Sequence, residues 1–350
     1  MQNFNLNFQQ QIAKKIVFQI GYVGSNGHKL LRFRDINQPS HAQITAADLA
    51  CNCIASTRAL SNPNLFYIYW QESGGNSTYN SMQTSLRVND WHGLTSTLNY
   101  NWSHSIDDSS DSDDFVQNAA QPTDSTQPET NRGNSNFDVR NRLTWNFIYN
   151  FPNRKGSWSR LTDGWGVNGI VTVQSGQPFH LIFSEDDFDG SGQFFPKPDV
   201  VGPIVYHQRD PNNFLDLTAF AVPCTPVATG FDGTAATCTP GTRHFGNLGR
   251  NSLLGPNFRQ FDFSIFKNTP ITERLKMELR FEAYNLLNHP NFANPYLPNF
   301  LADGAPNGFD SSGRAKGSLA LGVTGDVGIG YPYLGSGGPR SLQIAAKFIF

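Results

Sequence analysis

The segment Arg274-Leu-Lys-Met-Glu-Leu-Arg-Phe-Glu-Ala-Tyr284 decides the fold, because its side chains alternate between two kinds. Apolar residues stand at every second position, and charged residues fill the positions between them. Successive side chains of a β-strand point to opposite faces. The segment therefore predicts a strand with one apolar face and one charged face. The apolar set is Leu275, Met277, Leu279, Phe281 and Ala283, and the charged set is Lys276, Glu278, Arg280 and Glu282.

The same alternation recurs along the chain, whereas the 3.6-residue period of a helix is almost absent. With the segment above, it predicts about nine strands, most of them near the 9–11 residues that a tilted strand needs to cross a bilayer. The other eight lie at residues 4–8, 15–22, 78–88, 94–103, 142–151, 165–173, 260–266 and 342–350.

The connections between these strands alternate between short and long. Long structureless loops are uncommon inside a compact soluble domain, where connections of about 4–6 residues are typical. Short turns on one side and long loops on the other are typical of an outer-membrane β-barrel, and this pattern puts Phe350 on the periplasmic side. The short connections are 11–13, 89–93, 152–163 and 268–273, and the long ones are 24–77, 104–136, 176–257 and 285–339.

The composition agrees with a barrel and argues against nucleic-acid binding. Hydrophobic residues make up 38% of the 350 residues and aromatic residues 13%. A barrel can turn such rings toward lipid, and a soluble β-rich protein would bury them in a core, so composition alone does not choose between the two. The formal net charge of −2 gives no global basic field for nucleic acid. No apolar run reaches the roughly 18 residues of a transmembrane helix, so only a closed barrel could span a membrane.

No motif predicts catalysis, a cofactor or a metal centre. The chain lacks G-x-S-x-G, a P-loop, a dinucleotide fingerprint and H-E-x-x-H, and we expect no enzyme activity. Two acidic stretches, 106–114 and 187–192, carry the hard oxygen ligands that calcium prefers. Neither has the spacing of an EF-hand, and a hydrated surface loop is the favoured interpretation of both.

Among the four cysteines, Cys224 and Cys238 form the candidate disulfide. Their bridge would close a loop of about 15 residues, worth about 3 kcal/mol in an oxidising compartment. Trp91, Trp102, Trp145, Trp158 and Trp165 fall near predicted strand ends, which favours an interfacial aromatic belt.

Several segments, taken in order, resemble the Oar-like family of TonB-dependent outer-membrane receptors. Two carry most of the resemblance: Asn247-Leu-Gly-Arg-Asn-Ser-Leu-Leu-Gly-Pro-Asn-Phe-Arg-Gln-Phe-Asp-Phe-Ser-Ile-Phe-Lys267 and Leu279-Arg-Phe-Glu-Ala-Tyr-Asn-Leu-Leu-Asn-His-Pro-Asn-Phe292. Weaker matches lie at residues 19–25, 77–83, 137–142 and 164–179, so the resemblance spans nearly the whole chain.

The resemblance implies an all-β, antiparallel, up-and-down transmembrane barrel of 22 strands with an N-terminal plug. Residues 1–350 then represent one domain, an incomplete barrel with long outer loops that contains about nine of those strands. The first residues lack the basic start, apolar run and cleavage site of a signal peptide. We therefore expect a C-terminal barrel fragment in which plug and signal peptide are absent.

The implied function is active uptake of an unidentified solute across the outer membrane of a Gram-negative bacterium. The implied partners are outer-membrane lipid, the barrel-assembly machinery and, through the missing plug, the TonB complex, with no nucleic acid. Ile344, Phe348 and Phe350 form the candidate assembly signal, since an aromatic-ended edge strand can be read by β-augmentation. Lys276, Glu278, Arg280 and Glu282 are the candidate lumen-facing charges.

Two other interpretations remain open from the sequence. A secreted β-sandwich acting as an adhesion or carbohydrate-binding module would also show period-two strands and solvated loops. It predicts strands of about 5–6 residues and no alternation of loop lengths. A passive porin would need a complete barrel but no plug.

Overall fold

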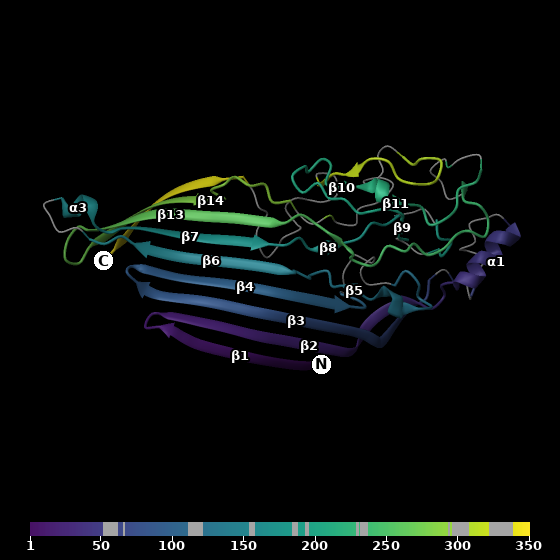
Figure 1. Cartoon of the computed structure of the whole chain (residues 1–350), viewed down its shortest axis with the longest axis horizontal. Coiled ribbons are helices and arrows are strands. Elements are labelled where there is room, and N and C mark those ends of the chain that lie inside the picture. Colours follow the sequence, from purple (N-terminus) through teal and green to yellow (C-terminus); the bar gives the residue numbers. More distant parts are fainter. Residues whose placement is uncertain are drawn as a thin grey trace.

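Nine long strands follow one another across a single antiparallel sheet in the computed structural model (Figure 1). Their order in the sheet is their order along the chain, which is the up-and-down topology that the alternation predicts. The structure describes residues 1–51, 62–65, 67–110, 122–153, 158–183, 188–192, 196–228, 231, 237–292, 295, 308–321 and 339–350. The nine strands are β1 (Gln2–Ala13), β2 (Ile16–Asp35), β3 (Tyr69–Trp91), β4 (Leu94–Asp107), β6 (Asn141–Asn150), β7 (Trp165–Gln174), β13 (Phe258–Pro270), β14 (Lys276–Tyr284) and β16 (Ser341–Ile349).

Two strands extend well into what the sequence predicts as a loop at 24–77. β2 has 20 residues and β3 has 23, and their pairing continues to Asp35 and Tyr69. The extension carries apolar side chains, including Leu31 and Phe33, and an ion pair between Arg32 and Glu72, with 2.7 Å between Nη2 and Oε1. Register shifts between Gly27 and Leu31 separate this part from residues 15–22, so the alternation does not continue in phase along β2.

The connections sort by end of the sheet as predicted (Figure 1). Residues 14–15, 92–93, 151–164 and 271–275 connect strands at one end, whereas 36–68, 108–140, 175–257 and 285–340 connect them at the other. The tight turn between β3 and β4 has φ of 51° at His92 and 87° at Gly93. Two successive positive φ values suit the turn types that follow the twist of a hairpin, and glycine adopts the second without strain.

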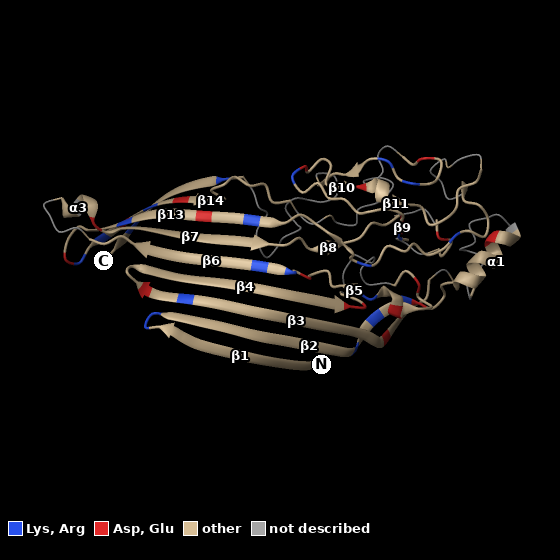
Figure 2. Cartoon of the chain, in the orientation of Figure 1, with Lys and Arg blue, Asp and Glu red and all other residues tan. Residues whose placement is uncertain are grey.

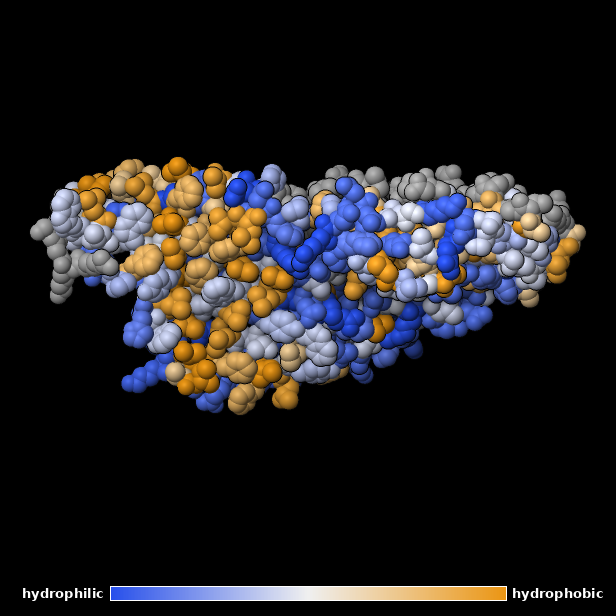
Figure 3. All heavy atoms as spheres, turned by 45° about the horizontal axis from the view of Figure 1, so that its top comes forward, coloured by the Kyte–Doolittle hydropathy of each residue, from blue (hydrophilic) through white to orange (hydrophobic). Residues whose placement is uncertain are grey.

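The register gathers the apolar side chains on one face of the sheet. Leu98 of β4 lies opposite Leu86 of β3 and Trp145 of β6, and Phe281 of β14 lies opposite Ile265 and Ile344. Many of these side chains are exposed, and hydrophobic residues gather over the strand half of the molecule (Figure 3). An exposed apolar band around the strands is the surface that a barrel turns toward lipid.

The long connections are not only solvated loops, which corrects the sequence interpretation. We call the described residues of 175–257 and 308–321 the loop cap. Nearly all the buried hydrophobic side chains of the described chain lie in this cap, and they form one core. The cap faces water, so it must bury its apolar side chains. The nine long strands, which we call the wall, expose theirs. The core contains Phe179, Leu181, Phe183, Phe188, Phe214, Leu215, Leu217, Ala219, Phe220, Val222, Cys224, Cys238, Leu248, Leu253, Ala315, Leu319 and Leu321.

Small elements build the long-loop end. Three pairs of two-residue strands connect parts of the cap, and the helix α1 (His41–Cys51) packs against it through the fully buried Ile44 and the buried Asp48. Among the described residues, no helix is long and apolar enough to cross a bilayer. The remaining elements are η2 (Pro128–Asn131), β5 (Gly133–Asn134), α3 (Ser159–Thr162), β8 (Pro178–Phe179), β9 (Asp199–Val200), β10 (Leu215–Asp216), η3 (Leu217–Ala219), β11 (Phe220–Ala221), β12 (Leu253–Leu254) and β15 (Ser318–Leu319).

The sheet is open. β1 pairs only with β2, and β16 pairs only with β14, within the described part of the chain. One continuous sheet of long strands does not match a sandwich, which needs two sheets packed face to face. The structure therefore excludes the sandwich alternative.

Candidate functional site

Hydrophilic side chains occupy the face of the sheet opposite the apolar band, which we call the lumen face. Gln83, Ser85 and Arg87 of β3 lie opposite Asn101, Asn99 and Thr97 of β4. Asn101 and Asn99 lie in turn opposite Arg142 and Thr144 of β6. Because directly opposed residues share a face, the register carries this polar character across three strands.

A hollow of about 390 Å³ lies on the lumen face, and we call it the polar hollow. Its only charged residues are Arg87 and Arg142, which come from strands on either side of β4. Strand alternation shows which residues share a face but not which strands lie side by side, so the sequence alone does not reveal this site. The polar hollow is lined by Gln19, Gln83, Thr84, Ser85, Arg87, Asn99, Asn101, Arg142 and Thr144.

A second hollow of about 340 Å³ is more apolar. Ile148 of β6 and Ile170 of β7 are both exposed in it, on diagonal positions of the lumen face. Side chains on the lumen face point away from lipid, so Ile148 and Ile170 can contact a molecule or a protein segment inside the barrel. This hollow is lined by Thr95, Ser96, Thr97, Asn146, Phe147, Ile148, Asn168 and Ile170.

The predicted lumen charges of β14 lie on the same face of the sheet. Glu282, Arg280, Glu278 and Lys276 are opposite Ser264, Phe266, Asn268 and Pro270 of β13. The Arg280 side chain forms ion pairs with both glutamates, at 2.5 Å (Nε to Glu278 Oε1) and 3.8 Å (Nη1 to Glu282 Oε1). The charges of this strand therefore largely neutralise each other, and Figure 2 shows how few other charges the wall strands carry.

A buried arginine connects the loop cap to the wall. Arg250 is 2% exposed and forms an ion pair with Asp107, the last residue of β4, which is also buried. Its Nε also donates to the Asn131 carbonyl oxygen at 2.8 Å, and its Nη1 donates to Ser110 Oγ at 3.1 Å. An uncompensated charge at this depth would be costly, so the pair and its hydrogen bonds fix the cap to the end of β4.

Asn251 continues this junction with a left-handed backbone, at φ 51°. Its Nδ2 donates to the carbonyl oxygen of Asn134 at 2.9 Å and to Asn136 Oδ1 at 2.7 Å. Asparagine tolerates positive φ better than most residues, and its amide bonds the next loop. The Arg250-Asn251 pair of the resembling motif therefore joins two long connections.

Two other buried groups of the cap lie near Arg250. Burial, with the charges of Lys197 and Arg250, lowers the pKa of His180 to about 3, although a hydrogen bond with Asn251 opposes this. The ring is therefore neutral at physiological pH. Burial, aided by Arg250, also lowers the pKa of Lys197 to about 7.

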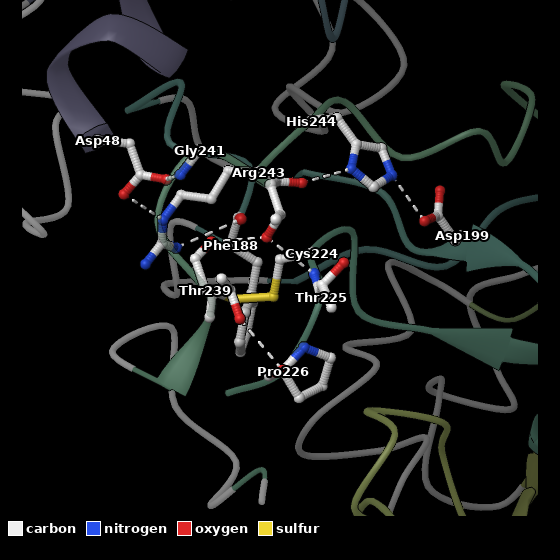
Figure 4. Close-up of a disulfide and its surroundings, with 12 residues drawn as sticks. Asp48, Phe188, Asp199, Cys224, Thr225, Pro226, Thr239, Gly241, Arg243 and His244 are labelled. Carbon is white, nitrogen blue, oxygen red and sulfur yellow. Dashed lines mark hydrogen bonds and ion pairs between the residues drawn. A yellow bond between two sulfur atoms is a disulfide. The ribbon is translucent and has the colours of Figure 1, made fainter. Parts of the chain in front are cut away.

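A disulfide joins Cys224 and Cys238 within the cap core, with 5.7 Å between their Cα atoms (Figure 4). Close to it, the Arg243 side chain forms a buried ion pair with Asp48 of α1, at 3.2 Å between Nε and Oδ1. Gly241 N donates to Asp48 Oδ2 at 2.6 Å. Helix α1 is therefore held on the cap by one buried carboxylate.

His244 lies between two acceptors (Figure 4). Its Nε2 lies 2.7 Å from Asp199 Oδ2, and its Nδ1 lies 3.0 Å from the Thr242 carbonyl oxygen. Both ring nitrogens can donate only in the protonated ring. The hydrogen bond with Asp199 is the main cause that raises the pKa of His244, and burial partly opposes it.

The two acidic stretches, predicted to be hydrated surface loops with calcium binding as the alternative, are only partly described, and Asp187 lies outside the described residues. Asp107 and Asp108 bind Arg250 and Arg132, whereas residues 111–114 lie outside the described part of the chain. Asp189 is buried and accepts a hydrogen bond from Ser191 N at 2.9 Å. Within the described residues, no three acidic, histidine or cysteine side chains cluster as metal ligands do.

The residues proposed as an assembly signal lie at the open edge. Ile344 and Phe348 belong to β16 and are 80% and 52% exposed, on the apolar face with Phe281 and Met277 of β14. Phe350 follows the strand and is 95% exposed.

Three of the five tryptophans predicted for an interfacial belt lie at the short-turn end of the sheet, and the other two lie within strands. Trp91, Trp158 and Trp165 are exposed at the short-turn end, and Trp102 is exposed where β6 begins to pair with β4. Trp145 lies in the middle of β6, and its Nε1 donates to Ser96 Oγ at 2.8 Å. A tryptophan in the middle of the wall satisfies its N–H within the sheet, because lipid offers no acceptor there.

One family model and several solved structures are similar to this chain. A family model described as "Outer membrane beta barrel domain" matches residues 1–318. No curated protein matches the sequence. Among solved structures, the chain is similar to the outer membrane transporter YddB from Escherichia coli, with 8% identity, a TM-score of 0.43, and coverage of 99% of this chain and 32% of that one. It is also similar to the ferripyoverdine receptor of Pseudomonas aeruginosa bound to ferripyoverdine, with 10% identity, a TM-score of 0.39, and coverage of 99% and 26%.

The chain thus spans about a third or less of the length of these two solved structures. The matched family is a barrel domain and not a class of enzymes. Since its model covers most of the sequence, and since the wall has the apolar band and the two unlike ends of a barrel, the chain belongs to the outer membrane beta barrel domain family and lies in the bacterial outer membrane.

Proposed function

We propose that this chain is the C-terminal barrel part of a TonB-dependent receptor of the Oar-like kind, which takes up a solute actively across the outer membrane. The observation that carries the proposal is a nine-stranded wall that is open at both edges and has a hydrophilic lumen face and a folded cap. The resemblance of the 247–267 and 279–292 motifs supports the Oar-like assignment.

The open edges favour a larger barrel. Each free edge leaves backbone N–H and C=O groups without partners, and such groups cost several kcal/mol each in lipid. β1 and β16 run in the same direction, because every pairing between successive wall strands is antiparallel. Direct closure would thus create a parallel pair unlike every other pairing in the wall. A wall continued by further strands avoids both problems.

The cap supports a receptor more than a passive porin. A porin needs an open channel. The long-loop end of this chain instead contains a packed core, a disulfide and two buried ion pairs. In a receptor, such a rigid outer structure would present loops to the solute. The energy would come from the TonB complex through a plug.

Uptake measurements in the native bacterium test the proposal. Accumulation of labelled ferric citrate, cobalamin, maltoheptaose and a tripeptide is compared with and without the gene, each with and without a protonophore. We expect one solute whose accumulation needs both the gene and the proton gradient. Gene-dependent accumulation that ignores the protonophore would instead identify a porin, and unchanged accumulation of all four would contradict uptake of these solute classes.

We also propose that Ile344, Phe348 and Phe350 are read by the barrel-assembly machinery. Their exposure on an edge strand leaves both the aromatic rings and the backbone available for strand addition. Phe350→Ser should lower the amount of heat-modifiable protein in outer-membrane fractions, whereas the control Phe151→Ser, at the end of an internal strand, should not. Equal amounts for both variants would contradict the role.

A further inference from the structure

The polar hollow is lined by two arginine side chains and by no acidic side chain. Arg87 and Arg142 are exposed and form no ion pair or hydrogen bond within the described part of the chain. On β14, by contrast, Arg280 lies between Glu278 and Glu282. The hollow is thus a positively charged surface with no internal counterion.

Three amide side chains of the hollow also have no protein partner among the described residues. They belong to Gln83, Asn99 and Asn101. Asn99 and Asn101 are half-buried, and such groups are normally paired. Their free amides, beside two arginines without partners, therefore suit a ligand that accepts hydrogen bonds.

The geometry suits a small ligand with more than one anionic group. Arg142 lies opposite Asn101, and Arg87 lies opposite Thr97, so the two arginines are offset by four residues along β4. At about 3.3 Å per residue, this offset is about 13 Å, which two long side chains can span from opposite ends. The volume of about 390 Å³ falls in the range of small-molecule sites.

We propose that the polar hollow binds a small solute carrying two or more carboxylate or phosphate groups, held by Arg87 and Arg142; this rests on the proposed uptake function. Each guanidinium would donate two hydrogen bonds to one oxyanion, and the amides of β3 and β4 would orient the body between them. The small volume favours a solute over an acidic protein segment.

Calorimetric titration of the purified full chain in detergent micelles tests the proposal, with citrate and inorganic phosphate as probes. The variants are Arg87→Gln, Arg142→Gln and both together. The control is Glu278→Gln with Arg280→Gln, which keeps the net charge and removes a lumen arginine that is already paired. Heat-modifiable migration on gels checks that every variant is folded.

We expect citrate to bind more tightly than phosphate, each single variant to weaken citrate binding about tenfold, and the control to leave it unchanged. Binding should also weaken with rising salt. Equal citrate binding by the double variant, or no binding of either probe by the natural chain, would overturn the proposal. A hexaglutamate peptide that binds the natural chain more tightly than citrate would instead assign the hollow to a protein segment. Citrate binding needs no uptake, so failure of the transport assay leaves this test interpretable.

Discussion

The wall and the loop cap place their apolar side chains in opposite ways. The wall exposes its apolar side chains and lines its other face with amides, hydroxyls and a few charges. The cap buries a core of aromatic and aliphatic side chains and closes it with a disulfide, as a water-soluble domain does. One chain therefore contains a region with its apolar side chains outside and a region with its apolar side chains inside. The difference shows that the surrounding medium, lipid or water, decides which face of a region is apolar.

The largest expected effect lies at the junction of the two regions. Arg250→Ala should destabilise the cap by about 3–5 kcal/mol, because it leaves the Asp107 carboxylate buried without a counterion. Limited proteolysis of outer-membrane vesicles would show the cap cleaved while the wall remains protected. Asp107→Asn combined with Arg250→Ala should recover part of the loss. If the single variant were as resistant as the natural chain, the junction would not depend on this pair.

Loss of the disulfide should affect the cap alone. Replacing Cys224 and Cys238 with serine releases a loop closure worth about 3 kcal/mol, since the two positions are 14 residues apart. Proteolysis with and without a reducing agent measures the effect. The natural chain under reduction should match the double variant, and heat-modifiable migration of the wall should not change. Wall migration that changed with reduction would show that the two regions are not independent.

Adjacent residues on β4 test the two faces of the wall. Leu98→Arg places a charge on the apolar face and should cost about 2–4 kcal/mol in a bilayer, depending on its depth. Asn99→Arg places the same charge on the lumen face and should cost less than about 1 kcal/mol. Unfolding by denaturant in lipid vesicles measures both. Equal costs would contradict the assignment of the faces.

The smallest expected effect is a pH dependence in the cap. The pKa of His244 is raised, mainly by Asp199, so its stabilisation is complete below about pH 6.5 and is lost as the pH rises through the raised pKa. The side chain is 42% exposed, so water weakens the pair and about 0.2–1 kcal/mol is expected. His244→Gln should flatten the difference in protease resistance between pH 6 and pH 8.5. An unchanged slope in that variant would assign the pH effect to another group.

The sequence predicted the wall far better than the cap, for a physical reason. A lipid-facing strand must alternate, so segments such as 274–284 reveal both the strand and its two faces. The cap core instead joins residues such as Phe188, Leu215 and Leu319, which lie far apart in the chain and in strands of two residues or none. No local period records such packing.

The candidate site falls between these cases. Alternation places Ser85 and Arg87 on the hydrophilic face, but only the register shows that Arg142 joins them across β4. Arg250 could not be recognised, because a buried arginine in a glycine-rich segment looks the same in sequence as an exposed one. Its position in a motif of the resembling family was the available signal.

The separation of bonded partners along the chain has a consequence for the order of assembly. The two cysteines are 14 residues apart and can be oxidised in the periplasm while the polypeptide is still unfolded. Asp107 and Arg250 are 143 residues apart, so their contact can form only after β4, β6 and β7 have paired with one another. The loop cap would thus cross the membrane with its disulfide already formed. The ion pair of Arg250 with Asp107 would attach the cap to β4 only after the strands are inserted.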